Sequence, residues 1–185
     1  MFMVCVTLDT NILIDFLLIQ WKEDKKQPIT DLLKRSREIK NKYLEKKFTN
    51  YVSEWGLLEF RDVVEKLVEE RKLIENGYSL SEFSEGRKEL PLTLIEIKTI
   101  NSIVNEVYQY SIMKMPTINL KILRKICQNG FSTFDALLLM HANETEECKY
   151  FVTRDKRLIK NAPTIIPFHL SEIKIINRKQ ALNLF

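Results

Sequence analysis

The sequence predicts an α/β fold, a three-layer α/β/α sandwich with a central, mostly parallel sheet. Short apolar, β-branched stretches at 3–8 and 150–153 alternate with longer segments whose apolar residues recur at helical spacing. Hairpin signals are scarce, so consecutive strands are expected to be joined by helices and to run parallel. In such sheets, functional residues gather at the carboxyl ends of the strands.

A chain of 185 residues is long enough for a sizeable core, and we expect a single domain over 1–185. A hydrophobic fraction of 45% is typical of a folded globular protein. Apolar stretches are too short to span a membrane and the N-terminus lacks the features of a secretory signal, so a cytoplasmic location is expected. The three cysteines are odd in number and far apart, which argues against a disulfide framework or a cysteine zinc site.

The expected helices are recognised by apolar periodicity and by residues that start or stop them. Ser53 fits the N-cap of one long helix, and Gly77 fits its C-terminal stop. Pro28 begins the helix before it, and Ser132 or Thr133 caps a later, largely apolar helix near 134–143. Further helices are expected near 12–19, 95–108, 120–127 and 178–184.

The expected strands place two acidic residues at one edge of the sheet. Strands are expected at 3–8, 48–52 and 150–153, with shorter β stretches at 164–167 and 173–176. The segment 78–90 is polar and holds Gly86. Asp9 directly follows the first strand, and Asp155 closely follows the strand at 150–153. Both carboxylates are therefore expected at the carboxyl edge, where sites form in parallel sheets.

Four short blocks around these acids resemble the motifs of PIN domains, a family of metal-dependent nucleases. The blocks are Leu8-Asp9-Thr10-Asn11-Ile12-Leu13, Val52-Ser53 with Leu58-Glu59-Phe60, Ser132-Thr133-Phe134-Asp135-Ala136-Leu137, and Phe151-Val152-Thr153-Arg154-Asp155-Lys156-Arg157-Leu158. They occur in the family's order. The resemblance implies a PIN-like fold and an endoribonuclease that hydrolyses single-stranded RNA. It also implies a set of catalytic and metal-binding acids, namely Asp9, Glu59, Asp135 and Asp155.

The metal that the resemblance implies for this acidic pocket is Mg²⁺ or Mn²⁺. Crowded carboxylates repel one another and raise one another's pKa values unless a cation neutralises them. Hard divalent cations prefer oxygen ligands, and a water bound to them can attack a phosphodiester. Hydrolysis of this kind needs no nucleophilic serine, cysteine or lysine.

Each of these acids also has a simpler interpretation. Asp9 and Asp135 stand where helices begin and could be capping acids, and Asp155 could be a turn residue. Glu59 could be a solvated surface acid, with Glu54 as its rival for the site. The family block ends in Leu-Glu, which favours Glu59.

Several polar residues near the acids are secondary candidates. Thr10, Asn11 and Thr153 could orient ligands or waters, with backbone capping as an equal alternative. Asp15 lies within an apolar helix, where an exposed position is expected. His141 lies on a helix that is apolar on most sides, and it is expected as a buried histidine whose hydrogen bonds are satisfied.

The net charge of +4 is concentrated in one segment. Residues 21–47 hold ten Lys or Arg and five Asp or Glu, so the rest of the chain is close to neutral. This segment is a candidate RNA-binding surface, and an ordinary solvated helix face is the competing interpretation. The candidate RNA contacts are Lys34, Arg35, Lys42 and Lys46. For Arg154, Lys156 and Arg157, a solvated surface position is preferred.

The spacing between the blocks is longer than in the similar small PIN toxins of toxin–antitoxin pairs. Asp9 and Glu59 are 50 residues apart, and Glu59 and Asp135 are 76 residues apart. The additional length is expected as helical extensions near 21–48 and 71–91, which could gate substrate or form an oligomer surface. A toxin and an RNA-processing enzyme both fit, with an antitoxin protein or a second copy of the chain as candidate partners.

Two other classes of protein are considered. The main alternative is a non-catalytic PIN-like scaffold that binds RNA or protein, but the presence of all four acids favours the enzyme. A phosphatase of the haloacid-dehalogenase type also begins with a strand-terminal aspartate and needs a second aspartate two residues later. Asn11 stands at that position, so we set this class aside.

Overall fold

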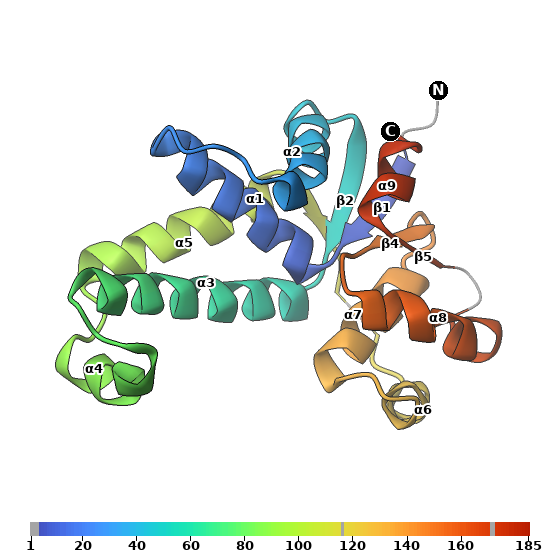
Figure 1. Cartoon of the computed structure of the whole chain (residues 1–185). Helices are drawn as coiled ribbons and strands as arrows, with labels where there is room; N and C mark the ends of the chain where they lie inside the picture. Colours follow the sequence, from blue (N-terminus) through green and yellow to red (C-terminus); the bar gives the residue numbers. More distant parts are fainter. Residues whose placement is uncertain (1–3, 116, 171–172) are drawn as a thin grey trace.

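The structure, a computed structural model, describes residues 4–115, 117–170 and 173–185, with the side chains of 164–169 left undescribed. Over these residues the chain forms a five-stranded sheet with helices on both faces (Figure 1). The strands are β1 (Val4–Leu8), β2 (Phe48–Val52), β3 (Ser111–Met113), β4 (Tyr150–Val152) and β5 (Lys174–Ile176). Every neighbouring pair is parallel, so the expectation of an α/β protein with a helix-covered parallel sheet is confirmed.

The order of the strands in the sheet is β3-β2-β1-β4-β5, with β1 in the centre. The chain moves outwards from β1 through β2 to β3, then crosses to the other side of β1 to form β4 and β5. The direction of winding therefore changes between β1 and β4, where Leu8 lies beside Val152. Ligands of open parallel sheets bind at such a switch point, beyond the carboxyl ends of the two strands.

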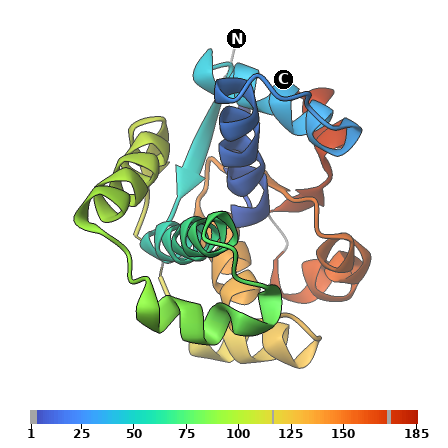
Figure 2. The same ribbon diagram turned by 60° about the vertical axis from the view of Figure 1, so that its left-hand side comes forward.

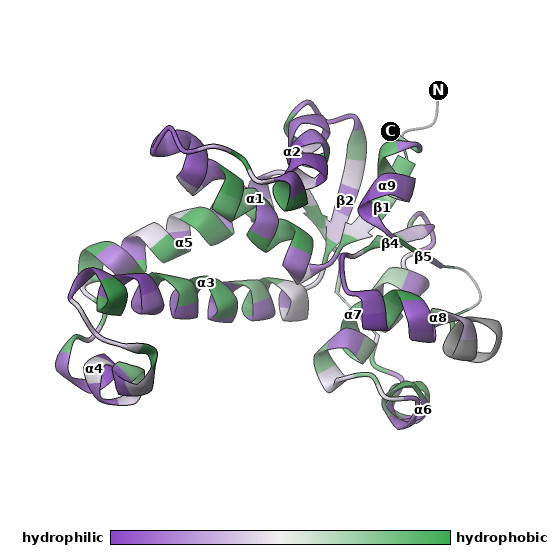
Figure 3. Cartoon of the chain, viewed as in Figure 1, coloured by the Kyte–Doolittle hydropathy of each residue, from purple (hydrophilic) through white to green (hydrophobic). Residues whose placement is uncertain are grey.

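One face of the sheet is covered by four helices. They are α1 (Thr10–Asp24), α2 (Asp31–Leu44), α5 (Leu94–Gln109) and α9 (Arg178–Leu182). Val6 and Leu8 of β1 point to this face and join its apolar core, whereas Thr7 points to the opposite face, because side chains alternate along a strand. The outer surface of α2 is largely hydrophilic (Figure 3), as its basic composition predicts.

The opposite face is covered by three helices from the second half of the chain. They are α6 (Leu120–Gln128), α7 (Thr133–Glu144) and α8 (Lys156–His169). Phe151 of β4 and Leu139 of α7 are fully buried in the second apolar core, which these helices close. The two cores separate the sheet from solvent on both sides, which is the layering that a parallel sheet requires.

The long helix α3 (Glu54–Glu75) starts at the carboxyl end of β2 and extends beyond the sheet. Ser53 caps it by accepting a hydrogen bond from the Gly56 amide at 3.1 Å, and Gly77 follows its end with a φ of 85°, so both expected signals are confirmed. The η1 turn (Leu80–Glu82) and α4 (Phe83–Glu89) lie at the far end (Figure 2). Even the 22-residue α3 lacks the apolar character to cross a membrane, and no other helix of the described residues qualifies.

Several expectations about the elements are wrong. The segment 164–167 belongs to α8 instead of a strand, because local β propensity is a weak preference that a continuing helix overrides. The strand β3 was not expected. The second helix begins at Asp31, after the N-cap Thr30, rather than at Pro28.

Candidate active site

Asp9 lies at the carboxyl end of β1 and is the N-cap residue of α1. Its backbone amide donates to the carbonyl of Val152 at 2.9 Å, which fixes it beside the end of β4. The Asp9 carboxylate makes no capping hydrogen bond to α1, so the simpler interpretation of this residue as a capping acid does not explain it. It is instead turned away from the helix and 5% exposed.

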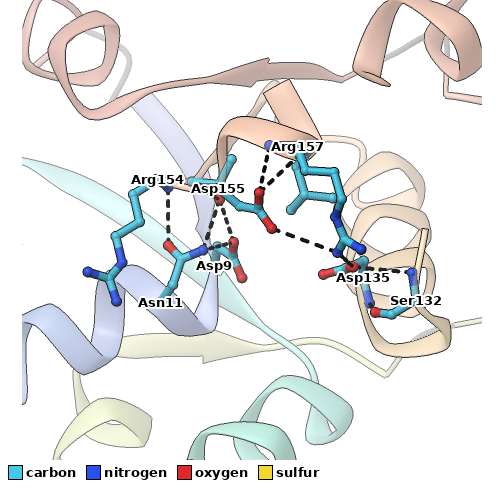
Figure 4. A network of polar contacts seen from close by, with 9 residues as sticks. Asp9, Asn11, Ser132, Asp135, Arg154, Asp155 and Arg157 are labelled. Carbon is cyan, nitrogen blue, oxygen red and sulfur yellow. Dashed lines mark hydrogen bonds and ion pairs between the residues drawn. The ribbon is translucent and has the colours of Figure 1, made fainter. Parts of the chain in front are cut away.

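A short hydrogen-bond network ties Asp9 to the turn after β4. The Thr153 hydroxyl donates to Asp9 Oδ2 at 2.5 Å, and the Asn11 amide nitrogen donates to the same oxygen at 2.5 Å. The Thr153 oxygen also accepts from the Asp155 amide at 2.9 Å, and the Asn11 oxygen accepts from the Arg154 amide at 3.1 Å. Asn11 and Thr153 thus hold the Asp155 turn against Asp9 (Figure 4).

Asp155 also starts α8. Its Oδ1 accepts hydrogen bonds from the amides of Arg157 at 2.7 Å and Leu158 at 3.4 Å, so this oxygen has the capping role that the simpler interpretation describes. Oδ2 lies 3.8 Å from the guanidinium of Arg157. The side chain is 33% exposed, and one of its two oxygens therefore remains open to a ligand.

Glu59 reaches the site from α3. The Thr10 hydroxyl donates a hydrogen bond to Glu59 Oε2, and this contact connects the first turn of α1 with the second turn of α3. Glu59 is partly buried, whereas Glu54, its rival in the sequence, is exposed in the first turn of the helix. The geometry brings Glu59 to the other acids and leaves Glu54 outside.

Asp135 reaches the site from the first turn of α7. It forms a capping box with Ser132, in which Asp135 Oδ2 accepts from the Ser132 amide at 3.2 Å and Ser132 Oγ accepts from the Asp135 amide at 3.1 Å. Arg157 Nη2 lies 2.9 Å from the same Oδ2 and bridges Asp135 to Asp155. Arg157 was expected as solvated surface charge, but it contacts two carboxylates of the site.

The pKa values of Asp9 and Glu59 reflect burial and the nearby acids. The pKa of Asp9 is raised to about 7, mainly by burial and further by the charges of Glu59, Asp135 and Asp155, against the effect of the Thr153 hydrogen bond. Burial also raises the pKa of Glu59, against the effect of the Thr10 hydrogen bond, with a further rise from Asp135. A pocket of this kind favours any group that brings positive charge to it.

The donor set suits a hard cation, but the present arrangement does not yet form a metal site. Carboxylate oxygens are the ligands that Mg²⁺ and Mn²⁺ prefer. Within the described residues, however, no three His, Cys, Asp or Glu side chains are grouped closely enough to hold an ion. Arg157 supplies positive charge between Asp135 and Asp155 instead, and its side chain is 55% exposed and therefore free to rotate away.

The four basic residues named as RNA contacts do not gather at this site. Lys34 is paired with Asp31 at 2.6 Å, and Lys42 lies in the last turn of α2. Lys46 follows α2 and precedes β2, so it lies at the amino edge of the sheet, opposite the acids. Arg35 is exposed in the first half of α2, next to Ser36, which contacts the interior of the protein.

Two expectations about single residues are corrected. Asp15 was expected at an exposed position, but it is fully buried and contacts Arg154, Arg178 and Ser36. The sequence contained one signal of this burial, because Asp15 is a carboxylate within an otherwise apolar helix, six residues after Asp9. His141 is buried as expected, but its Nε2 has no hydrogen-bond partner in the described part of the chain.

Comparisons of the chain with protein-family models, with curated proteins and with solved structures found no match. Fold and site therefore define the class on their own. Over the described residues, the protein is an α/β protein with a parallel five-stranded sheet and with a set of acidic side chains at the switch point of that sheet, two of which, Asp9 and Glu59, have raised pKa values.

Proposed function

We propose that this protein is a PIN-like, metal-dependent endoribonuclease that hydrolyses single-stranded RNA at the pocket of Asp9, Glu59, Asp135 and Asp155. One observation carries the proposal. The carboxylates of α3, of α7 and of the turn before α8 lie near enough to Asp9, at the end of β1, to add to the rise that burial gives its pKa, at the position where parallel sheets bind ligands. A structural role would not need so many like charges in one place, since each costs stability there.

The residues of the proposed site have two roles, to bind the metal and to orient the residues that bind it. Asp9, Glu59, Asp135 and Asp155 are the proposed ligands of Mg²⁺ or Mn²⁺, which would activate a water and neutralise charge on the phosphodiester. Thr153 and Asn11 orient the Asp9 carboxylate through their hydrogen bonds, and the Thr10 hydroxyl orients Glu59. With a pKa of about 7, the Asp9 carboxylate is only about half ionised near pH 7 without a metal, and a bound cation would lower that pKa.

The test is the loss of activity in Asp9→Asn. This change keeps the size of the side chain but removes a charged ligand, so cleavage of single-stranded RNA in the presence of Mn²⁺ is expected to fall at least about a hundredfold, a loss of about 2.7 kcal/mol of transition-state stabilisation. Asp24→Asn is the matched control, because Asp24 is an exposed acid at the other end of α1 that accepts a hydrogen bond from Gln20. Equal cleavage by Asp9→Asn and the wild type would reject the proposal.

A non-catalytic PIN-like scaffold is the second candidate, and the position of Arg157 favours it. An arginine that bridges Asp135 and Asp155 can neutralise an acidic pocket permanently, in which case no metal is needed. The two candidates differ in their response to metal. The enzyme requires that a divalent cation displaces Arg157 from the two carboxylates, and the scaffold requires that Arg157 stays bound to them.

The cellular setting follows from the proposed activity. We propose a cytoplasmic nuclease that acts either as a toxin, with an antitoxin protein as its inhibitor, or in RNA processing. The helices in 21–48 and 71–91 fall where extensions relative to small PIN toxins are expected. They are the proposed surfaces for an antitoxin or for a second copy of the chain.

A further inference from the structure

A cluster of charged side chains surrounds the buried Asp15, beside the acidic site, and uses none of the four acids of that site. Asp15 of α1 accepts hydrogen bonds from Ser36 Oγ at 2.6 Å and from Arg178 Nη1 at 3.1 Å. Its other oxygen lies 3.0 Å from Arg154 Nη1, a contact of ion-pair distance that does not have hydrogen-bond geometry. The cluster therefore joins α1, α2, α9 and the turn after β4.

The cluster carries an uncompensated positive charge. Two guanidinium groups share the single carboxylate of Asp15, which is fully buried, and Ser36 is neutral. Arg178 directs Nη1 at Asp15, at Ser36 and at the carbonyl of Leu32 at 2.8 Å. Its remaining N–H groups have no acceptor within the described ranges, and neither have the remaining guanidinium N–H groups of Arg154.

These groups remain accessible to a ligand. The Arg154 side chain is 33% exposed and the Arg178 side chain is 14% exposed, so neither guanidinium is sealed within the core. The buried carboxylate of Asp15 contacts both guanidinium groups, and this contact fixes their positions before a ligand binds. A pair of oriented guanidinium groups with spare donors is suited to a phosphate, whose oxygens accept parallel hydrogen bonds.

The cluster is joined directly to the acidic site. The Arg154 amide donates to Asn11, which in turn donates to Asp9, and Arg154 immediately precedes Asp155. Figure 4 shows the Arg154 side chain extending away from Asp135 and Asp155, on the side opposite Arg157. A polyanion that crosses the acidic pocket is repelled by its carboxylates, so positive charge beside the pocket is needed to hold the strand.

We propose that Arg154 and Arg178 form an anion subsite that binds a phosphate of the single-stranded RNA, next to the phosphodiester at the acidic pocket. The inference rests on the proposed nuclease function for its ligand, and Asp15 is its positioning residue. The surplus charge is what attracts the phosphate, whereas Asp15 limits that charge and holds the two side chains in place.

Binding of a short fluorescein-labelled oligouridylate, measured by anisotropy in EDTA over a range of KCl concentrations, tests the subsite without cleavage. Arg178→Gln is expected to weaken binding about three- to tenfold at low salt and to reduce the slope of log affinity against log salt by about 0.7, the value for one neutralised phosphate on a single strand. Arg178→Lys keeps the charge but loses the guanidinium geometry, so it should bind more weakly while the slope stays unchanged.

Asp15→Asn distinguishes the subsite from a purely structural cluster. This variant leaves both arginines uncompensated and keeps an acceptor for Ser36, but it also loosens the two guanidinium groups that Asp15 positions. The subsite therefore requires a steeper dependence of affinity on salt concentration than in the wild type, whatever the affinity itself. An unchanged or shallower salt dependence would overturn the proposal. Arg87→Gln, which removes a more exposed arginine of α4 that is paired with Glu69, is the control and should change neither affinity nor slope.

The outcomes also separate this inference from the proposed function. If the wild type does not bind the oligouridylate at any salt concentration, the proposed substrate class is wrong. If the wild type binds but the Arg178→Gln and Arg178→Lys variants both match it, the subsite alone is wrong. Thermal melting of each variant establishes that it is folded, and Asp15→Asn decides the question should Arg178→Gln fail to fold.

Discussion

Arg157 controls the charge balance of the acidic pocket at the scale of single residues. Its guanidinium contacts Asp135 and Asp155, two of the proposed metal ligands, so it competes with a divalent cation for the same oxygens. Arg157→Gln removes this competitor. We expect Mn²⁺ to bind the variant about three- to tenfold more tightly than the wild type in calorimetric titrations, since about 1.4 kcal/mol corresponds to a factor of ten.

The control for this prediction is Lys156→Gln, which removes an exposed positive charge from the preceding position of α8. That variant should bind Mn²⁺ about as tightly as the wild type. Weaker binding by Arg157→Gln would mean that the arginine supports the metal site instead of competing with it. Absence of Mn²⁺ binding in every variant would favour the scaffold.

His141 makes the stability of the fold depend on pH. Burial and, to a smaller extent, the nearby charge of Lys114 together lower the pKa of His141 to about 4. The unfolded chain binds a proton near the ordinary pKa of 6.5, whereas the folded protein resists it, so stability is full above pH 6.5 and is lost as the pH falls towards 4. The loss approaches about 1.4 kcal/mol per pH unit in this window.

His141→Met isolates this contribution, because methionine fills a similar volume and does not titrate. Urea unfolding of the variant and the wild type between pH 7 and pH 5 should show a smaller loss of stability in the variant. Equal losses would mean that the buried imidazole accepts its proton without cost, in which case a partner for Nε2 exists that the present arrangement does not contain.

At the scale of elements, the cap of α3 positions Glu59. Ser53 Oγ accepts a hydrogen bond from the Gly56 amide, whereas the corresponding N-cap of α2, Thr30, makes no side-chain cap. Ser53→Ala should therefore reduce the free energy of unfolding by about 1 kcal/mol, and Thr30→Ala should change it by less than about 0.5 kcal/mol. Urea unfolding measures both, and similar effects for the two variants would contradict this account of the cap.

Local sequence patterns were sufficient to predict the ends of α3 but not the strand β3. The start and end of α3 depend on Ser53 and Gly77, whose effects act within one turn, and both were recognised in the sequence. The strand β3 has only three residues and pairs with β2 alone, so no periodicity could reveal it. Its existence depends on the edge that β2 offers, which is a property of the sheet.

At the scale of the whole molecule, metal binding should stabilise the fold. If the four carboxylates bind Mn²⁺, a concentration of about a hundred times the dissociation constant adds about 2.7 kcal/mol to the stability of the native state. For a chain of this size, that corresponds to a rise in melting temperature of roughly 5 to 10 °C. Asp9→Asn should show a much smaller rise, and Asp24→Asn, the control at the other end of α1, should respond as the wild type does.

Melting curves with Mn²⁺, with Mg²⁺ and with EDTA provide the measurement. In EDTA, Asp9→Asn is expected to be as stable as the wild type or more stable at pH 8, because ionising the buried Asp9 costs stability above its pKa of about 7. A melting temperature that is independent of both metals in the wild type would favour the scaffold over the enzyme.

The sequence by itself determined the class of fold and nominated the acids. Alternation of strand and helix patterns is sufficient for a parallel sheet, and the placement of Asp9 and Asp155 after strands is sufficient to put both at its carboxyl edge. The order β3-β2-β1-β4-β5 then brings these two carboxylates to adjacent strands. Chain position alone could not show this, because adjacency in a sheet is set by the pairing of segments that are distant in sequence.

Only the tertiary structure decided what surrounds the acids. The burial of Asp15, its two arginine partners and the bridge formed by Arg157 all join elements that are far apart in the chain. From the sequence, Asp15 was expected at an exposed position and Arg154 and Arg157 were expected as solvated surface charge, because charged side chains usually are solvated. Whether a charge is solvated or paired depends on which helices cover it, and packing settles that after every local preference has been satisfied.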